Sequence, residues 1–368
     1  MKRLACLLLL LCLLISAAGG ALAADESVQG ELVIYSSMYP FVLEMLDAAI
    51  AEEFPNLKPG NDGSFFLYGG TSKLINRIYG EMEDEGVLGC DMLLVAEPAL
   101  SLELKDAGYL EPVAIEGAEQ LLRFPYDEEG FWYPVRVCNM VLAYNPEVVT
   151  RWVWEDMDVT IPRTFEDFAM DRSLKGYIAM GDPMSSGTTF AAIACLTQSN
   201  HYGRQYLRGL AANEVQVISS SEAIRKIRNG EIAAAMILEE AVLKALRDAE
   251  DGGASISDLA CIYPEDGVIL IPSTVMTVKN EHSRNGNVQA SEAVERWFLS
   301  EAAQKIMLQG YMHSVFRNME EVPVGSVDTN ELIEKDMGVN WENVYHSREE
   351  INQAWMEIVA NRGTGGSR

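Results

Sequence analysis

The chain has 368 residues, of which 48% are hydrophobic, and it carries a formal net charge of −27. This length and composition are sufficient for two domains with buried cores, and they exclude an intrinsically disordered chain. The negative charge argues against nucleic acid as a partner, and we attribute it to a solvated surface.

The first residues have the pattern of an export signal. Lys2 and Arg3 precede a long apolar run, and Ala21 to Ala23 form a small-x-small cleavage site. We therefore expect a signal peptide over residues 1–23 and a mature protein that is periplasmic or extracellular. An uncleaved membrane anchor is the alternative, because the apolar run is near the minimum length of a membrane span.

From Glu31 onwards, short apolar strands alternate with amphipathic helices, which predicts an α/β fold with parallel sheets flanked by helices. In the first series the predicted strands are 31–37, 64–70 and 90–97, and the predicted helices are 39–54 and 71–83. A second series of strands and helices occupies residues 176–250.

Two longer apolar stretches, 132–146 and 261–279, lie outside these two series. Each is long enough to cross from one lobe to another, so the pair predicts two lobes joined by a double hinge. The expected boundaries are lobe 1 at 24–137 and 275–320, lobe 2 at 138–274, and hinge crossovers near 135–145 and 263–278. One helix is predicted over 290–311, and residues 321–368 are expected to form a C-terminal helical region, with a helix at 348–360, and a flexible tail.

A Ser-Ser-Gly-Thr-Thr turn, residues 185–189, follows the predicted strand at 176–180. Ser186 has the position of a helix N-cap, Gly187 permits close approach of a ligand, and Thr188 lies in the first helical turn. Ser185 precedes the cap. Free backbone N–H groups, hydroxyls and the helix dipole together favour an anion at such a turn, although an ordinary capped helix has the same pattern.

Two further strand ends in the first series carry small and hydroxyl residues. Gly70, Thr71 and Ser72 begin the second predicted helix, and Lys73 follows them. The first strand ends in hydroxyl side chains, which are Ser36, Ser37 and, slightly later, Tyr39. Ligands in open parallel sheets bind beyond the carboxyl ends of the strands, so these turns and the Ser186 turn predict a cleft between the lobes. The aromatic candidates for its walls are Tyr35, Tyr39, Phe65 and Tyr68, with core packing as the alternative for Phe65.

The order of these segments along the chain resembles that in the type 2 extracellular solute-binding proteins of ABC importers. It runs from the strand at 31–37 through GGTSKLINRI, GDPMSSGTTFAAIA and SSEAIRKIRNGEIAAAMILEE to EAVERWFLSEAAQKIM. The resemblance is to the branch that contains ferric-ion, aminoethylphosphonate and sugar-phosphate binders. It implies two α/β lobes, two crossover strands, hinge closure on a ligand in the cleft, and delivery to a membrane permease.

The resemblance also implies site residues. In the ferric binders a Ser-Gly dipeptide at the start of a second-lobe helix holds an anion, which matches Ser186 and Gly187. Adjacent tyrosines hold iron in those proteins, whereas this chain has Glu239 and Glu240 at that position. Carboxylates suit an ammonium group, sugar hydroxyls or a hard cation, so the difference argues against a simple ferric site. The alternative is that either glutamate only begins the next helix.

Three further residues are candidates for ligand contact. Glu97 lies near the position of a family carboxylate ligand. Arg136 and Asn139 begin the first crossover, and an arginine there can bind phosphate or carboxylate through two hydrogen bonds. Either residue can instead stabilise the hinge.

Catalytic signatures are sparse. The four histidines show no metal-ligand spacing, and the chain has no HExxH, GxSxG or Walker A motif. We therefore expect a solute carrier that has no catalytic residues, no cofactor and no resident metal. We expect it to be a monomer and to capture a small anionic or zwitterionic ligand, with a phosphonate or a phosphorylated sugar favoured. The alternatives are a ferric or other metal-ion carrier and a secreted hydrolase that pairs Glu97 with Glu239. The four cysteines after the signal are expected to be buried free thiols rather than disulfides.

Overall fold

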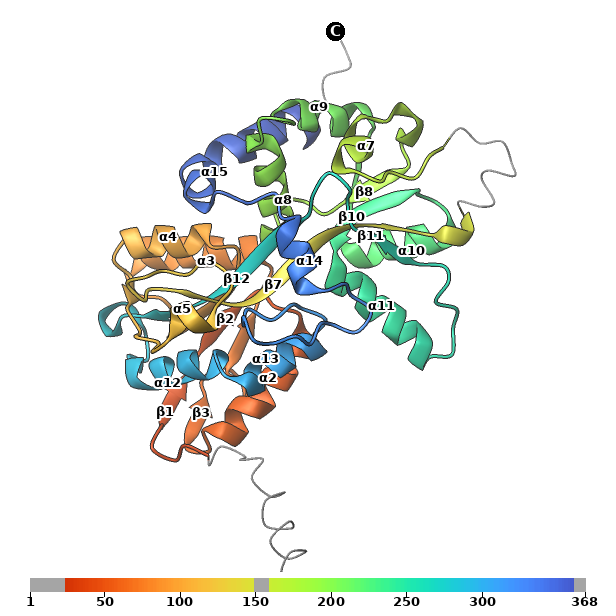
Figure 1. Cartoon of the computed structure of the whole chain (residues 1–368). Coiled ribbons are helices and arrows are strands. Elements are labelled where there is room, and N and C mark those ends of the chain that lie inside the picture. The colour runs from red at the N-terminus through yellow and green to blue at the C-terminus, as the bar shows by residue number, and fades with distance from the viewer. Residues whose placement is uncertain (1–23, 149–158, 361–368) are drawn as a thin grey trace, which may run out of the picture.

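The computed structural model describes residues 24–148 and 159–360, so the predicted signal peptide and the end of the predicted tail lie outside the described residues. The chain forms two α/β lobes (Figure 1). The long strands β7 (Tyr133–Tyr144) and β12 (Ile269–Val278) run through both lobes and pair with each other in antiparallel register. The fold predicted from the alternating strands and helices is confirmed.

A single ten-stranded sheet connects the lobes. Eight of its strands follow the order β4-β2-β5-β12-β7-β10-β8-β9, and β6 and β11 pair with β12 and β7, respectively. The second half of β12 pairs with β5, whereas the last residues of β7 pair with β10. Each long strand therefore belongs to lobe 1 through one half and to lobe 2 through the other. These are the two crossover strands that the apolar stretches predicted.

Lobe 1 contains the parallel strands β2, β4 and β5, with helices on both faces. Its strands are β1 (Gly30–Leu32), β2 (Ile34–Ser36), β3 (Leu57–Pro59), β4 (Phe66–Tyr68), β5 (Met92–Ala96) and β6 (Leu110–Glu111). Its helices are α2 (Pro40–Glu53), α3 (Thr71–Asp84), α4 (Ala99–Asp106), α5 (Ala118–Leu121), α12 (Val288–Phe298) and α13 (Glu301–Gln309), with a short 3-10 turn at Asn280–His282.

Lobe 2 is built from the second series. Its strands are β8 (Ile178–Met180), β9 (Gln216–Val217), β10 (Ala234–Leu238) and β11 (Ala260–Ile262). Its helices are α7 (Phe165–Met170), α8 (Gly187–Gln198), α9 (Gln205–Ala212), α10 (Ser220–Asn229) and α11 (Glu239–Asp251), with a 3-10 turn at Arg172–Leu174.

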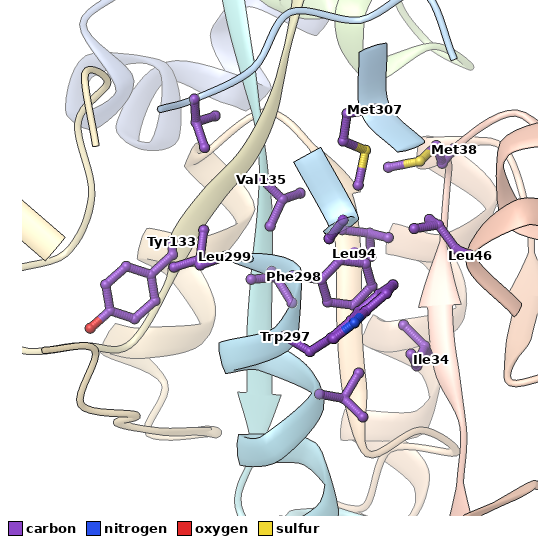
Figure 2. Packing of buried hydrophobic residues seen from close by; sticks show 14 of the residues in the cluster. Ile34, Met38, Leu46, Leu94, Tyr133, Val135, Trp297, Phe298, Leu299 and Met307 are labelled. Atoms are coloured by element: carbon purple, nitrogen blue, oxygen red, sulfur yellow. The ribbon is translucent and has the colours of Figure 1, made fainter. Parts of the chain in front are cut away.

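Each sheet face of lobe 1 packs a separate apolar core, because successive strand residues point to opposite faces. Ile34 of β2 and Leu94 of β5 pack with Leu46 of α2 and with Trp297 and Phe298 of α12 (Figure 2). The opposite face packs against α3 and α4, and its members include Tyr35, Leu74, Ile78, Leu93 and Leu100.

The helix predicted over 290–311 is two helices, α12 and α13. The break falls at Ser300, whose side chain accepts a hydrogen bond from the backbone N–H of Ala303 and so caps a new helix. The apolar spacing continues across the break, which is why the sequence read as one helix.

The C-terminal region contains α14 (Thr329–Glu334) and α15 (Trp341–Trp355), which continues into a π-turn at Met356–Ala360. The last helix therefore begins earlier than predicted. It packs against α4 of lobe 1 and against α8 of lobe 2 (Figure 1).

Candidate functional site

A cleft of about 550 Å³ lies between the lobes. Lobe 1 contributes Tyr39 and Phe41 at the start of α2 and Tyr68 at the end of β4. Lobe 2 contributes the start of α10 and one face of α11, whose lining residues are Ser219, Ser220, Ser221, Ile224, Glu240, Ala241, Lys244, Ala245 and Asp248. Helices that begin at the ends of sheet strands thus face each other across the cleft, as expected for an open α/β sheet.

Contacts across the cleft mouth already join the lobes. The Lys244 ammonium of α11 lies 4.9 Å from the centre of the Phe41 ring on α2, which is a cation–π distance. Lys244 is also bound by both carboxylate oxygens of Asp248, each at 2.8 Å. The charges of Lys244 and Asp248 therefore balance within the cleft wall.

The first turns of α3 and α8, both predicted from sequence, pack against each other. A Cβ atom built on Gly187 would lie 2.6 Å from Thr71 Cγ2, and one built on Gly70 would lie 3.5 Å from the Ser185 carbonyl oxygen. Ser186 is the N-cap of α8, as predicted, since its hydroxyl accepts from the Thr189 N–H. The structure therefore brings the two Gly-containing turns together but covers the start of α8 with the Thr71 side chain.

The other residues of these turns differ in exposure. Ser185 is exposed, Ser72 is half-buried, and Thr188 is buried. Lys73 is exposed to solvent on α3.

The serines after β2 bind the backbone of lobe 1. Ser36 is fully buried and accepts a hydrogen bond from the Met38 N–H, and Ser37 accepts one from the Ala96 N–H at 3.1 Å. These hydroxyls order the turn that leads to Tyr39. Among the aromatic candidates, Tyr39 and Tyr68 line the cleft.

Tyr35 and Phe65 are buried in the core of lobe 1 instead of lining the cleft. Tyr35 lies on β2 and Phe65 immediately precedes the edge strand β4, and each side chain packs into one of the two apolar cores.

Glu97 is buried between lobe 1 and the C-terminal helix. One carboxylate oxygen accepts a 2.5 Å hydrogen bond from Arg348 of α15, and the other accepts one from the Ala99 N–H. Burial raises the pKa of Glu97, and the Arg348 charge opposes that rise. Both oxygens are therefore occupied within the protein, which the sequence did not predict.

Glu239 is the centre of a buried polar network at the start of α11. Its carboxylate accepts hydrogen bonds from Tyr263, Ser326 and His313, the last at 3.1 Å. The Asn139 side-chain amide approaches it at 3.3 Å. Burial opposes ionisation of Glu239, but the hydrogen bonds from its neighbours outweigh burial and lower its pKa. The structure thus joins two candidate residues, Asn139 and Glu239, to one network.

Glu240 lines the cleft although its side chain is only 1% exposed. Arg136 Nη1 lies 3.5 Å from its Oε1 atom, so the two charges are paired across the hinge. Burial raises the pKa of Glu240, and Arg136 opposes the rise. Burial and the charge of Glu240 also raise the pKa of Tyr39, whose phenol forms part of the same cleft.

Four buried polar atoms of this pair and its neighbours make no hydrogen bond among the described residues. They are Arg136 Nε, Asn139 Oδ1, Ser273 Oγ and Glu240 Oε1, the last of which has only its ion pair with Arg136. Ser273 faces Arg136 in the register of β12 and β7. Unpartnered buried polar atoms are rare in folded proteins, so their concentration at the hinge marks a place where a solute or water can complete the hydrogen bonds.

Several residues around the site were not among the sequence candidates, namely Phe41, Ser219, Ser220, Ser221, Lys244, His313 and Arg348. The serines had a visible signal, because Ser-Ser-Ser-Glu at 219–222 places a cap three residues before a glutamate. His313 and Arg348, the partners of Glu239 and Glu97, had no such signal in the sequence, because each lies far along the chain from its glutamate.

No group of three or more His, Cys, Asp or Glu side chains suited to a metal ion occurs in residues 24–148 and 159–360. Cys90, Cys138 and Cys195 are buried free thiols, and Cys261 is a half-buried one. None of the helices in the described part of the chain has the length and apolar character needed to span a bilayer.

Known structures share this architecture. The periplasmic binding protein P5PA matches with 19% identity and a TM-score of 0.72 over 90% of this chain and 100% of its own. AfuA from Actinobacillus pleuropneumoniae, solved with fructose-6-phosphate, matches with 20% identity and a TM-score of 0.72 over 90% and 99% of the two chains. Iron-bound HitA from Pseudomonas aeruginosa matches with 18% identity and a TM-score of 0.71 over 89% of this chain and 99% of its own.

The sequence also matches a family model directly. No curated protein matches the chain significantly. The model described as a bacterial extracellular solute-binding protein, however, matches residues 90–336, which include both crossover strands and all of lobe 2. This span is more than half of the chain, and the shared two-lobed fold agrees with it. The chain therefore belongs to the bacterial extracellular solute-binding proteins, as the order of its motifs indicated.

Proposed function

We propose that this protein is the solute-binding component of an ABC importer, exported across the membrane, and that it captures a small anionic or zwitterionic solute between its lobes. A phosphorylated sugar or a phosphonate fits the cleft best. The observation that carries the proposal is the 550 Å³ cleft, which combines serines at a helix start, aromatic rings and a buried carboxylate from two lobes. A membrane permease would receive the solute.

Closure on the solute requires contacts with both lobes, because a ligand shifts an equilibrium only through its different affinity for the two states. Tyr39 and Tyr68 offer ring faces and hydroxyls from lobe 1, and α10 and α11 offer polar groups from lobe 2. A solute that spans the cleft therefore favours the closed arrangement.

The charge balance favours a sugar phosphate over an aminoalkyl phosphonate. Glu240 already faces the guanidinium of Arg136 at 3.5 Å, so an ammonium group would be a second cation on one carboxylate. A sugar hydroxyl is neutral, so it can approach the Glu240–Arg136 pair without adding charge to it.

The same contacts weigh against the two alternatives. Glu239 and Glu240, which stand where ferric binders have tyrosines, are engaged by His313, Tyr263, Ser326 and Arg136. Glu97 and Glu239, the carboxylates that a hydrolase would pair, belong to separate hydrogen-bond networks.

A ligand panel tests the proposal. Protein purified without added ligand is examined by native mass spectrometry and then by thermal shift with glucose 6-phosphate, fructose 6-phosphate, 2-aminoethylphosphonate, inorganic phosphate and ferric citrate. We expect a rise in melting temperature with the sugar phosphates, since ligand bound only to the folded state stabilises it. A response to ferric citrate alone supports the metal carrier, and consumption of a panel member supports the hydrolase; either result contradicts the proposal.

A further inference from the structure

We propose that Thr71 and Gly187 are positioning residues for solute capture. Thr71 of lobe 1 packs on Gly187 of lobe 2, and this contact sets how far the two lobes close. The inference rests on the proposed function, because closure serves the capture of a solute in the cleft. It also gives Gly187 a different role from the one expected from the sequence, in which a ligand approaches the glycine.

The Thr71–Gly187 contact leaves no space for a side chain at position 187. A Cβ atom built on Gly187 would lie 2.6 Å from Thr71 Cγ2, 2.9 Å from its Oγ1 and 3.0 Å from its Cβ. Gly187 is the first residue of α8 and has no positive φ angle, so its backbone conformation suits alanine equally well. The neighbouring side chain of the opposite lobe, and not the backbone, is therefore what requires glycine here.

Both turns are buried around this contact. Thr71 is 5% exposed, Thr188 is 7% exposed, and Gly187 is buried with them. These residues begin helices in different lobes, and separation of the lobes would expose them to water. Gly70 and Ser185 extend the contact, because a Cβ atom built on Gly70 would lie 3.5 Å from the Ser185 carbonyl oxygen, an ordinary van der Waals distance.

The Thr71–Gly187 contact is also more rigid than the contact at the cleft mouth. Lys244 reaches the Phe41 ring with a long side chain that can change its rotamer, whereas Thr71 has a β-branched side chain and meets a residue without one. Packed interiors tolerate little added volume, so one extra carbon at position 187 holds the lobes apart. A solute that binds the closed arrangement then loses affinity in proportion to the closed fraction.

Gly187→Ala adds that carbon and tests the inference. Gly80→Ala is the matched control, because Gly80 lies in α3 and a Cβ atom built on it has no heavy atom within 4 Å. Circular dichroism and melting temperature verify that each variant folds. Titration calorimetry measures affinity for glucose 6-phosphate, or for the sugar phosphate with the largest thermal shift. We expect Gly187→Ala to weaken binding about tenfold and Gly80→Ala to change it less than about twofold.

A second substitution separates a clash between the lobes from a clash with the solute. Thr71→Ala removes the atoms at 2.6 and 2.9 Å and leaves only the Cβ at 3.0 Å, a contact that a shift of a few tenths of an ångström relieves. We therefore expect Gly187→Ala to weaken binding less than about threefold when Thr71→Ala is already present. A loss of the same size in both backgrounds would mean that the added methyl group meets the solute itself, which overturns the inference.

A cysteine pair tests the contact without any solute. In Thr71→Cys/Gly187→Cys the Cβ atoms would lie 3.0 Å apart, close to the roughly 3.5–4.5 Å of a disulfide, so the bond can form only when the lobes are nearly closed. Oxygen with copper phenanthroline accepts the two electrons, and thiols are then titrated in denaturant. Lys73→Cys/Gly187→Cys is the control, because Lys73 is exposed and points away from Thr71 on the same helix. We expect the first pair to lose its two added thiols much faster than the control.

The outcomes separate this inference from the proposed function. Wild-type affinity in Gly187→Ala, or disulfide formation no faster than in the Lys73 control, overturns the inference while leaving the solute carrier intact. If Gly187→Ala fails to fold, the cysteine pair decides alone. Wild-type protein that binds no member of the ligand panel overturns the proposed function, and the role of the contact in capture falls with it even where the disulfide forms.

Discussion

The carboxylate of Glu239 is 1% exposed, yet three side chains donate hydrogen bonds to it. Burial opposes ionisation, but the donors outweigh it, so the pKa of Glu239 lies below the ordinary carboxyl value of 4.5. A carboxylate with a lowered pKa in the folded state adds stability above pH 4.5, and that contribution is lost as the pH falls through the folded pKa.

We therefore expect Glu239→Gln to lower the free energy of unfolding by about 2 kcal/mol at pH 7, since hydrogen bonds to a charged acceptor are removed. The difference from wild type should shrink as the pH falls below 4.5 and through the lowered pKa of Glu239, because wild type then loses the ionised carboxylate. Urea unfolding at several pH values measures both effects. Glu320→Gln, at an exposed position, is the control, and two curves that stay parallel down to pH 3 would count against this role.

Residue-scale features were predictable from sequence where they are local. The Ser186 cap depends on residues three apart, and both the residue type and the following helix are visible in the sequence. The partner of Glu97 is Arg348, 251 residues later, and the partner of Glu239 is His313, 74 residues later. Such pairs depend on how the whole chain folds, so a single sequence does not reveal them.

At the level of elements, the apolar patterns predicted the strands β2, β4, β5 and β8 and the helices α2 and α3. The second crossover stretch, 261–279, contains two strands, β11 and β12, and the two both pair with β7. The predicted helix at 290–311 is broken at Ser300 because a capping interaction competes with continuation of the helix. Periodicity finds the apolar face of an element, whereas the capping residue sets where the element ends.

The cap at Ser300 leads to a stability prediction. Ser300→Ala removes the acceptor for the Ala303 N–H at the start of α13, and we expect it to lower the free energy of unfolding by about 1 kcal/mol. Ser255→Ala, at an exposed loop serine, should change it by less than about 0.5 kcal/mol. Equilibrium unfolding in urea compares the two, and equal effects would show that the Ser300 hydroxyl does not determine the break.

For the whole molecule, α15 connects the lobes in addition to the two crossover strands. Arg348 binds Glu97 of lobe 1 at 2.5 Å, and its guanidinium lies 4.8 Å from the centre of the Phe190 ring of lobe 2. Arg204, the residue immediately before α9, binds Glu350, which fixes α15 to lobe 2. The sequence indicated a C-terminal helix, but its packing across both lobes depends on contacts with α4 and α8 that no local pattern specifies.

This arrangement predicts that Arg348 influences both stability and the separation of the lobes. Arg348→Met leaves the buried Glu97 carboxylate without its cation, and removal of one partner of a buried pair costs about 3 kcal/mol or more. We expect lower stability in urea, a larger radius of gyration of the ligand-free protein in small-angle X-ray scattering, and weaker binding of the solute.

Two further variants separate the bridge from a general effect on α15. Arg204→Met breaks an exposed pair between lobe 2 and α15 that does not touch lobe 1, and we expect a loss below about 1 kcal/mol with an unchanged radius of gyration. The double variant Glu97→Gln/Arg348→Met should recover part of the stability, because the uncompensated charge is gone, but it should retain the larger radius, since the link between lobes remains broken. A radius of gyration in Arg348→Met equal to that of wild type would show that α15 does not restrain the lobes.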